Sequence, residues 1–136
     1  MEQQKITITM PLFIQLDKKQ QGKKYYINLN HYRNWHYMVN NNLKKKYAEL
    51  LHEKLPNDIV FKNPIELTFI LWKKDKRRID RANPLSIHEK FFCDALVTYG
   101  AIPDDNDNFI VATHYYTGGI DKKNPRVEII VHETIS

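Results

Sequence analysis

The segment IELTFILW, residues 65–72, most constrains the fold of this chain, because β-branched and aromatic residues dominate it and few of its positions are polar. Such a run is typical of a strand in the interior of a sheet. A charged loop, residues 73–81, follows at once, and an amphipathic helix follows the loop. We therefore expect a central strand that delivers charged side chains to a sheet edge, where they are accessible while the framework stays rigid.

The helix after this loop carries its own start and stop signals. Asn83 and Pro84 predict its N-terminus, because Asn caps a free N–H group and Pro loses no hydrogen bond in the first turn. Ser86 and Glu89 form an alternative start, a capping box, and Gly100 is expected to end the helix. Apolar positions recur at three- and four-residue steps and predict one buried face, made of Leu85, His88, Phe92, Ala95, Leu96 and Tyr99.

The remaining segments predict further strands and one long helix. Residues 5–16 alternate well enough for a strand, although Pro11 indicates a bend or a sheet edge. A continuous apolar stripe predicts a helix over residues 31–54, with residues 40–42 as the place for a kink or break, since Asn is a poor helix former. Two more strands are predicted, at residues 109–116 and 126–133.

These elements predict an α+β domain, with two helices packed on a mixed sheet of about four strands in the order β-α-β-α-β-β. A length of 136 residues suits a single domain over residues 1–136, and 42% hydrophobic with 12% aromatic residues is typical of a globular chain. No run reaches the length of a membrane span, and no signal peptide is visible. We therefore expect a cytoplasmic protein without a membrane partner.

Cysteine and histidine usage argues against a metal centre built from these residues. The single cysteine, Cys93, excludes an intramolecular disulfide and a cysteine-based zinc cluster, and its place in the apolar helix favours a small buried side chain. No two of the six histidines have the helical spacing of a zinc site. His88 is expected at the margin of its helix, and Trp35 in the core, although its ring could instead stack on an exposed base.

Positive charge is concentrated in a few places. The net charge of +5 and the isoelectric point near 9.2 favour a nucleic-acid partner only weakly. The loop at residues 73–81 holds six Lys or Arg residues against two Asp residues. A charge run is usually only a solvated face, but basic and acidic groups side by side at a helix entrance favour phosphate chemistry. The predicted contacts to a DNA backbone are Lys73, Lys74, Lys76, Arg77, Arg78 and Arg81.

Carboxylates flank the helix on both sides. Asp80 precedes it, and Asp104, Asp105 and Asp107 follow it, while Lys90 lies on the helix itself. If both connections lie at the same edge of the sheet, these carboxylates converge near a lysine. Such a site suits Mg²⁺, which binds a few carboxylate oxygens and often shares the site with a substrate phosphate. The implied reaction is metal-assisted phosphodiester hydrolysis.

A simpler interpretation of the same residues is also open. Lys90 and Asp94 are one helical turn apart, so they could form an ordinary ion pair on the helix surface. Asp104 and Asp105 are turn-forming residues in their own right. Under this interpretation none of these residues needs a catalytic role.

The run KFFCDALVTYGAIPDDN from Lys90, with the upstream RRID and Asn83, resembles the RusA family of Holliday-junction resolvases, which are common in phages and prophages. The resemblance implies a homodimeric endonuclease that depends on Mg²⁺, with Mn²⁺ as an alternative ion, and that needs no small-molecule cofactor. Such an enzyme resolves branched DNA, the four-way junction, by paired symmetric nicks in the cytoplasm of the bacterial host. The matched features are Lys90, the triplet Asp94-Ala95-Leu96, Gly100 and the pair Asp104-Asp105.

The resemblance also implies a role for individual residues. Asp80, Lys90 and Asp105 match the catalytic residues of the family. Asp80 and Asp105 would hold the metal ion and orient an attacking water, with Asp104 as an auxiliary ligand. Lys90 would stabilise the negative charge that develops on the phosphate or on the leaving oxygen.

The chain departs from the family pattern at one acid. When the family motif is aligned on Asn83, the position of its second aspartate holds Ala82. The spacing from Asn83 to Lys90 is longer than the usual family spacing by about one helical turn. Either another carboxylate fills the role, or the site works with fewer ligands, or activity is lost. The candidates for the missing carboxylate are Asp104, Glu89 and Asp75.

Two other classes of function stay open beside the junction-resolving endonuclease. A module descended from such an enzyme but disabled at Ala82 would bind branched or single-stranded DNA without cutting it. A phage-encoded adaptor for protein partners would have little affinity for DNA at moderate salt.

Overall fold

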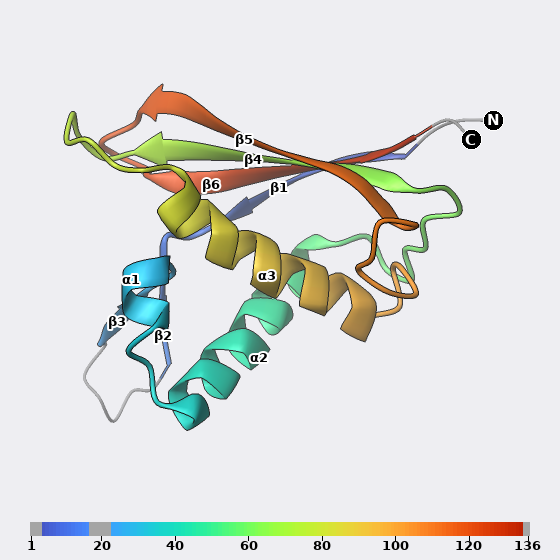
Figure 1. The fold of residues 1–136 in the computed structure, drawn as a ribbon, viewed down its shortest axis with the longest axis horizontal. Helices are drawn as coiled ribbons and strands as arrows, with labels where there is room; N and C mark the ends of the chain where they lie inside the picture. Colours follow the sequence, from blue (N-terminus) through green and yellow to red (C-terminus); the bar gives the residue numbers. More distant parts are fainter. Residues whose placement is uncertain (1–3, 17–22, 135–136) are drawn as a thin grey trace.

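The computed structural model describes residues 4–16 and 23–134, and its helices lie on one face of a β-sheet (Figure 1). The helices are α1 (Leu29–Tyr32), α2 (Tyr37–Lys54) and α3 (Ala82–Thr98). α2 packs against α3, α3 contacts the central strand, and none of the three is long and apolar enough to cross a membrane. The predicted α+β class is confirmed, with a short third helix in addition.

Four strands form the mixed sheet: β1 (Lys5–Met10), β6 (Arg126–Glu133), β4 (Ile65–Lys73) and β5 (Ile110–Ile120), in that order across it. β4 pairs parallel with β5 and antiparallel with β6, and β1 pairs antiparallel with β6. β4 is therefore a central strand, as its apolar sequence predicted. β1 and β5 are the two edge strands of this sheet.

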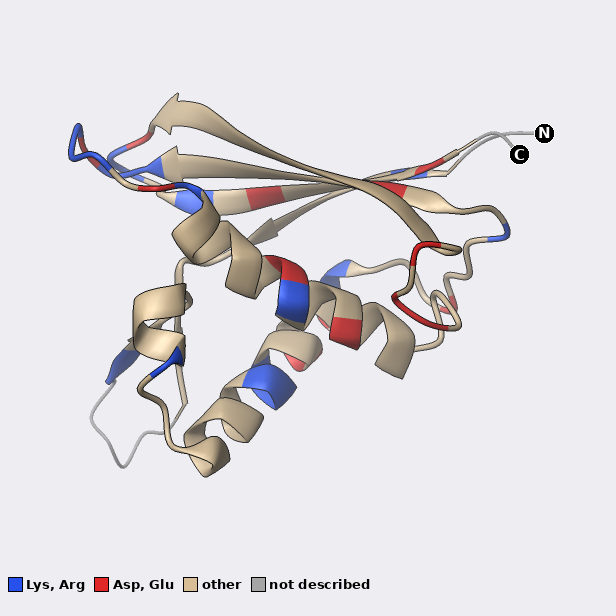
Figure 2. Ribbon diagram, viewed as in Figure 1, with Lys and Arg blue, Asp and Glu red and all other residues tan. Residues whose placement is uncertain are grey.

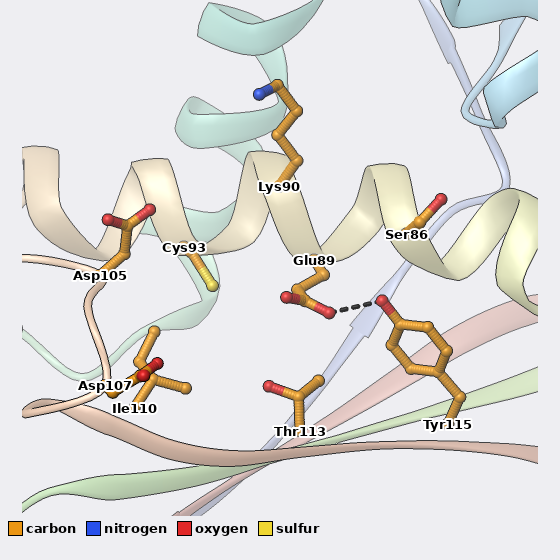
Figure 3. Close-up of a pocket in the computed structure, with 9 residues that line it drawn as sticks. All are labelled: Ser86, Glu89, Lys90, Cys93, Asp105, Asp107, Ile110, Thr113 and Tyr115. Carbon is orange, nitrogen blue, oxygen red and sulfur yellow. Dashed lines mark hydrogen bonds between the residues drawn. The ribbon is translucent and has the colours of Figure 1, made fainter.

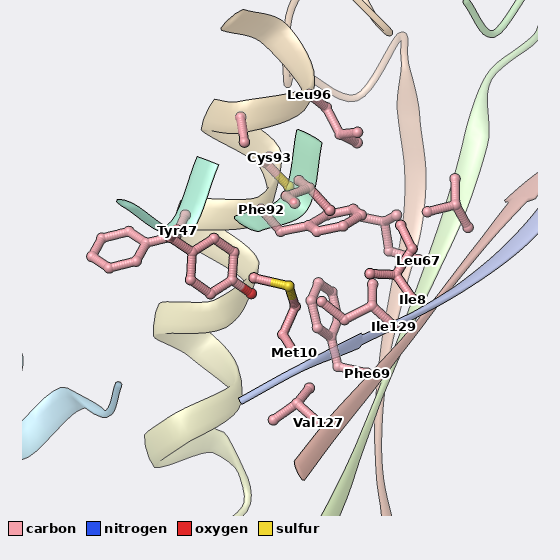
Figure 4. Packing of buried hydrophobic residues seen from close by; sticks show 14 of the residues in the cluster. Ile8, Met10, Tyr47, Leu67, Phe69, Phe92, Cys93, Leu96, Val127 and Ile129 are labelled. Atoms are coloured by element: carbon pink, nitrogen blue, oxygen red, sulfur yellow. The ribbon is translucent and has the colours of Figure 1, made fainter. Parts of the chain in front are cut away.

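The core lies between the sheet and the two longer helices (Figure 4). Alternate residues of β4 and β6 point toward the helices, and the rings of Phe69 on β4 and Phe92 on α3 meet edge to face with centroids 5.9 Å apart. Each such large side chain contributes roughly 1.5–3 kcal/mol by leaving water. The alternation predicted for the last strand is confirmed by the burial of Val127, Ile129 and Val131.

The strand predicted over residues 5–16 is two strands. β1 ends at Met10, and β2 (Phe13–Gln15) pairs antiparallel with β3 (Lys24–Tyr26) in a separate two-stranded sheet. Pro11 lies between β1 and β2, outside both strands. Its missing N–H group therefore leaves no gap in a ladder of hydrogen bonds.

The long helix predicted over residues 31–54 is interrupted, although not at residues 40–42, which lie inside α2. The interruption falls at residues 33–36, and the Nδ1 atom of His36 accepts a hydrogen bond from the backbone N–H of Met38 at 3.2 Å. The low helix propensity of three asparagines is thus outweighed by tertiary packing. The buried face of α2 consists of Leu43, Tyr47 and Leu51.

α3 ends as predicted but begins differently. Arg81 is its N-cap and makes no side-chain capping bond. The side chain of Asn83 instead accepts a hydrogen bond from the backbone N–H of Leu29 at 3.0 Å, and Ser86 donates to the carbonyl of Asn83 at 3.3 Å. Neither predicted cap forms, because these side chains serve other contacts. Gly100 does end the helix, with a φ of 76° in the left-handed region that glycine favours.

The crossover through α3 separates the two charged loops. Because β4 and β5 are parallel, the loop that leaves β4 and the loop that enters β5 lie at opposite ends of the sheet. α3 spans the distance between them with 17 residues, about 25 Å at about 1.5 Å per residue. Figure 2 shows basic residues gathered at one end and acidic residues at the other. The condition for converging carboxylates, both connections at one sheet edge, is therefore not met.

Candidate functional site

A pocket of about 410 Å³ lies between α3 and β5, halfway along the helix (Figure 3). It brings together two of the predicted catalytic residues, Lys90 and Asp105, although not the third, Asp80. The lining residues are Ser86, Glu89, Lys90 and Cys93 from α3, Asp105 and Asp107 from the connecting loop, and Ile110, Thr113 and Tyr115 from β5.

Glu89 is fixed within this pocket by Tyr115, whose hydroxyl donates a hydrogen bond to the Glu89 carboxylate across the gap between helix and strand (Figure 3). Partial burial raises the pKa of Tyr115 above its usual range, and the hydrogen bond to Glu89 and its negative charge raise it further. The hydroxyl therefore stays protonated and remains a donor. This bond restricts one carboxylate oxygen of Glu89 and leaves the other for a ligand.

The two adjacent acids of the connecting loop do different things. The Asp104 carboxylate accepts hydrogen bonds from the backbone N–H of Asp105 at 2.8 Å and from the side-chain amide of Asn106 at 3.1 Å. These bonds hold the pKa of Asp104 below its usual value. Asp104 thus stabilises its own turn, as the simpler interpretation proposed, while Asp105 lines the pocket (Figure 3).

Lys90 lies at the rim of the pocket and is exposed. Its side chain extends away from Glu89 and Tyr115 in Figure 3. It does not pair with Asp94, because Asp94 forms an ion pair of 2.7 Å with Lys44 of α2. The predicted ion pair on the face of one helix is therefore replaced by a bridge between two helices, and no carboxylate of the described residues holds the Lys90 ammonium group.

The pKa of the Cys93 thiol reflects the negative charge around the pocket. Cys93 is only 6% exposed, as expected for a small buried residue in this helix. Burial, and after it the negative charges of Glu89, Asp105 and Asp94, raises the pKa of Cys93 to about 12. The thiol is therefore unreactive at neutral pH, and its surroundings are negatively charged.

Asp80 lies beyond the N-terminus of α3, at the opposite end of the helix from the acidic loop. Its carboxylate accepts a hydrogen bond from the backbone N–H of Ala82 at 3.1 Å, which satisfies a free donor of the first helical turn. An acid there also interacts favourably with the helix dipole. Ala82, the position of the missing acid, begins α3 beside it. An acid at position 82 would therefore lie near the basic loop before α3 and not in the pocket.

The basic loop before α3 is held by contacts within the loop and by a contact to β5. Lys73 donates to the carbonyl of Arg77 at 3.1 Å, and Arg77 pairs with Asp75 at 3.1 Å. Arg81 donates to the hydroxyl of Thr117 on β5, also at 3.1 Å. The other predicted DNA contacts, Lys74, Lys76 and Arg78, are exposed on the same loop.

The family resemblance implies a divalent metal ion, and the pocket supplies part of a ligand set for such an ion. Within residues 4–16 and 23–134, no three His, Cys, Asp or Glu side chains are grouped closely enough to hold an ion by themselves. Glu89 and Asp105 nevertheless supply hard oxygen donors to one pocket, and Mg²⁺ commonly binds through one or two carboxylates with the substrate phosphate and water as further ligands. The donor set of the pocket fits such an ion, whereas the set of Asp80, Asp104 and Asp105 does not.

Tyr115 lines the pocket although its sequence pattern did not single it out. Tyr115 lies in a strand of mixed polarity, and only the alternation of Thr113 and Tyr115 on one face signals that both point toward the helix. Asp107 was noted among the acids after the helix, and the structure places it in the pocket. Pairing of a helix residue with a strand residue depends on packing, which local spacing does not encode.

Comparison with known proteins adds no assignment to this geometry. No protein-family model matches the chain, and no curated protein matches it either.

Proposed function

We propose that the protein is a metal-dependent endonuclease that cuts phosphodiester bonds in branched DNA, with its active site in the pocket between α3 and β5. The observation that carries the proposal is that Lys90 and Asp105, 15 positions apart in the sequence, line one pocket together with Glu89. The resemblance to the RusA family supports the same chemistry, since it marks Lys90 and Asp105 independently of the structure.

Each pocket residue has a role in this proposal. Asp105 and Glu89 would hold a divalent cation, and the bound ion would polarise the scissile phosphate and activate a water. Tyr115 would keep Glu89 in place through its hydrogen bond. Lys90 has a long and flexible side chain, so its ammonium group would turn toward a phosphate at the rim and balance the charge of the transition state.

Glu89 would replace the acid that is absent at Ala82. Of the three candidates considered from the sequence, Asp75 pairs with Arg77 in the basic loop and Asp104 is engaged in its own turn. Glu89 is the candidate that lines the pocket with Asp105. Asp80 would then stabilise the start of α3 and the basic loop, without contacting the metal ion.

The partner would be a four-way DNA junction, and two copies of the chain would act on it. Paired symmetric nicks need two active sites related by a two-fold axis, which a homodimer supplies. The basic residues of the loop before α3 would contact phosphates and not bases, so the selectivity for branched DNA would come from shape.

The test is cleavage of a synthetic four-way junction and of a matched linear duplex, in Mg²⁺ or Mn²⁺, by the natural protein and by Asp105→Asn. The proposal predicts metal-dependent nicking of the junction that Asp105→Asn abolishes. Glu49→Gln, a charge change on the exposed side of α2, serves as the matched control and should cut normally. Junction binding without cleavage in either metal by any of these proteins would refute the endonuclease.

A second candidate function is a DNA-binding module that does not cut. One observation favours it: the position that corresponds to the second motif aspartate of the RusA family holds Ala82, which cannot bind a metal ion. Such a module would bind junctions with a strong dependence on salt, and Asp105→Asn would bind more tightly, because it removes a negative charge from the pocket.

A further inference from the structure

Two loops meet at the end of the sheet opposite the acidic loop. The first, residues 74–81, joins β4 to α3, and the second, residues 121–125, joins β5 to β6. The backbone N–H of Asp121 donates to the carbonyl of Lys73 at 2.7 Å, so the loops lie side by side. Figure 2 shows the concentration of Lys and Arg at this end of the sheet. We call the two loops together the basic end.

The acids of the basic end are engaged by neighbouring groups. Asp75 pairs with Arg77 at 3.1 Å, and Asp121 pairs with Arg126 at 2.8 Å. Asp80 accepts the hydrogen bond from the start of α3. Arg81 donates to the Thr117 hydroxyl. The other cations are exposed and form no ion pair within the described part of the chain; they are Lys74, Lys76, Arg78, Lys122 and Lys123.

The basic end is held at a fixed distance from the pocket by β5. This strand passes the pocket at Thr113 and reaches the second loop at Ile120, seven residues later. At about 3.3 Å per residue the separation is about 23 Å along the strand. Successive base pairs of B-DNA are about 3.4 Å apart, so about seven base pairs of duplex span the same distance.

We propose that the basic end binds the phosphate backbone of a duplex DNA arm about seven base pairs away from the pocket. Lys122 and Lys123 of the second loop contribute to this surface together with the cations of the first loop. The inference rests on the proposed function for what happens at the pocket, because only a substrate held there fixes where the arm begins. Binding of the arm itself needs no cleavage and no metal ion.

The experiment measures the affinity of the natural protein and of Lys122→Ala/Lys123→Ala for four-way junctions in the presence of a chelator. Arms of about 5 and about 15 base pairs are compared, one shorter and one longer than the span. For long arms the double variant should bind more weakly, and the slope of log affinity against log salt should fall by about 1 for each lysine that contacts a phosphate. For short arms both proteins should bind alike.

The matched control removes two lysines from the other end of the sheet, as Lys5→Ala/Lys62→Ala, and should leave the difference between long and short arms unchanged. An unchanged salt slope of Lys122→Ala/Lys123→Ala on long arms would overturn the inference, as would an equal loss on short and long arms. A natural protein that binds no DNA at all would refute both this inference and the proposed function. Binding that depends on arm length, without any cleavage in Mg²⁺, would support DNA binding by the basic end and would refute the endonuclease.

Discussion

The hydroxyl of Tyr115 donates a hydrogen bond to the carboxylate of Glu89, and this contact joins the edge strand β5 to the middle of α3. It matters because both residues line the pocket that contains Lys90 and Asp105. A carboxylate that accepts a hydrogen bond from a fixed donor keeps its orientation, which is a property that a metal ligand needs.

Removing this donor tests the role of Tyr115 as a positioning residue. We expect Tyr115→Phe to lower kcat for junction cleavage about tenfold, which corresponds to about 1.4 kcal/mol, with little change in KM. Stability should change by no more than about 1.5 kcal/mol, since the ring remains. Steady-state kinetics and urea unfolding measure the two effects. Tyr116→Phe, on the exposed neighbouring residue, is the control, and an equal loss in both variants would contradict the proposed role.

Placing an aspartate at Ala82, the position where the sequence departs from the RusA pattern that it resembles, is expected to have no effect on activity. Ala82 lies at the start of α3 beside Asp80, at the end of the helix that points away from the acidic loop. The cleavage rate of Ala82→Asp should therefore stay within about twofold of the natural protein, less than about 0.5 kcal/mol in activation free energy. A large gain of cleavage would show that the site includes this position and that the pocket is not the active site.

Fold and site differ in how much of them the sequence could predict. β4 and β6 were predictable because burial of one or both faces leaves a local pattern of apolar residues. The start of α3 was not, because the side chain of Asn83 bonds to Leu29, 54 positions away. A cap and a long-range contact compete for the same oxygen, and only the tertiary structure decides between them.

The candidate site was predictable in part for the same physical reason. Lys90 and Asp105 were predicted from a resemblance to a family motif, and they do line one pocket. The pairing of Asp80 with them assumed that both flanking loops lie at one edge of the sheet. The parallel pairing of β4 with β5 places those loops at opposite ends instead. Strand direction depends on which strands pair, and no local spacing in this chain records it.

The buried pair of His88 and Tyr47 predicts a dependence of stability on pH. The periodicity placed His88 on the buried face of α3, at its margin; the residue is in fact fully buried, and its Nδ1 atom lies 2.8 Å from the Tyr47 hydroxyl, because α2 covers that side of α3. Burial lowers the pKa of His88 to about 3, below the value of about 6.5 for an unfolded chain. The unfolded state therefore binds a proton first as pH falls, and stability is lost below about pH 6.5 by up to about 1.4 kcal/mol per pH unit.

Urea unfolding at pH 7 and pH 5 measures this effect. His88→Leu has no group to titrate and should lose that part of the pH dependence, whereas His52→Gln, at an exposed position of α2, should keep it. The same slope in the natural protein and in His88→Leu would contradict the assignment.

The thiol of Cys93 measures the negative potential of the pocket without requiring activity. Its raised pKa predicts slow reaction with iodoacetamide at pH 8 in the folded protein and fast reaction after unfolding. Glu89→Gln and Asp105→Asn each remove a charge that raises this pKa, so both should speed the reaction at a given pH. Asp58→Asn, a charge change in the loop before β4, should leave the rate unchanged, and equal rates in all variants would place the thiol outside the field of the pocket.

The most direct measurement is single-turnover cleavage of a four-way junction in Mg²⁺ by three variants, Glu89→Gln, Asp105→Asn and Asp80→Asn. The pocket predicts that the first two lose at least about 100-fold in rate, about 2.7 kcal/mol or more, while Asp80→Asn stays within about tenfold of the natural protein. The account would be contradicted if Asp80→Asn lost as much cleavage rate as Asp105→Asn while Glu89→Gln stayed fully active. The active site would then consist of the acids that flank α3.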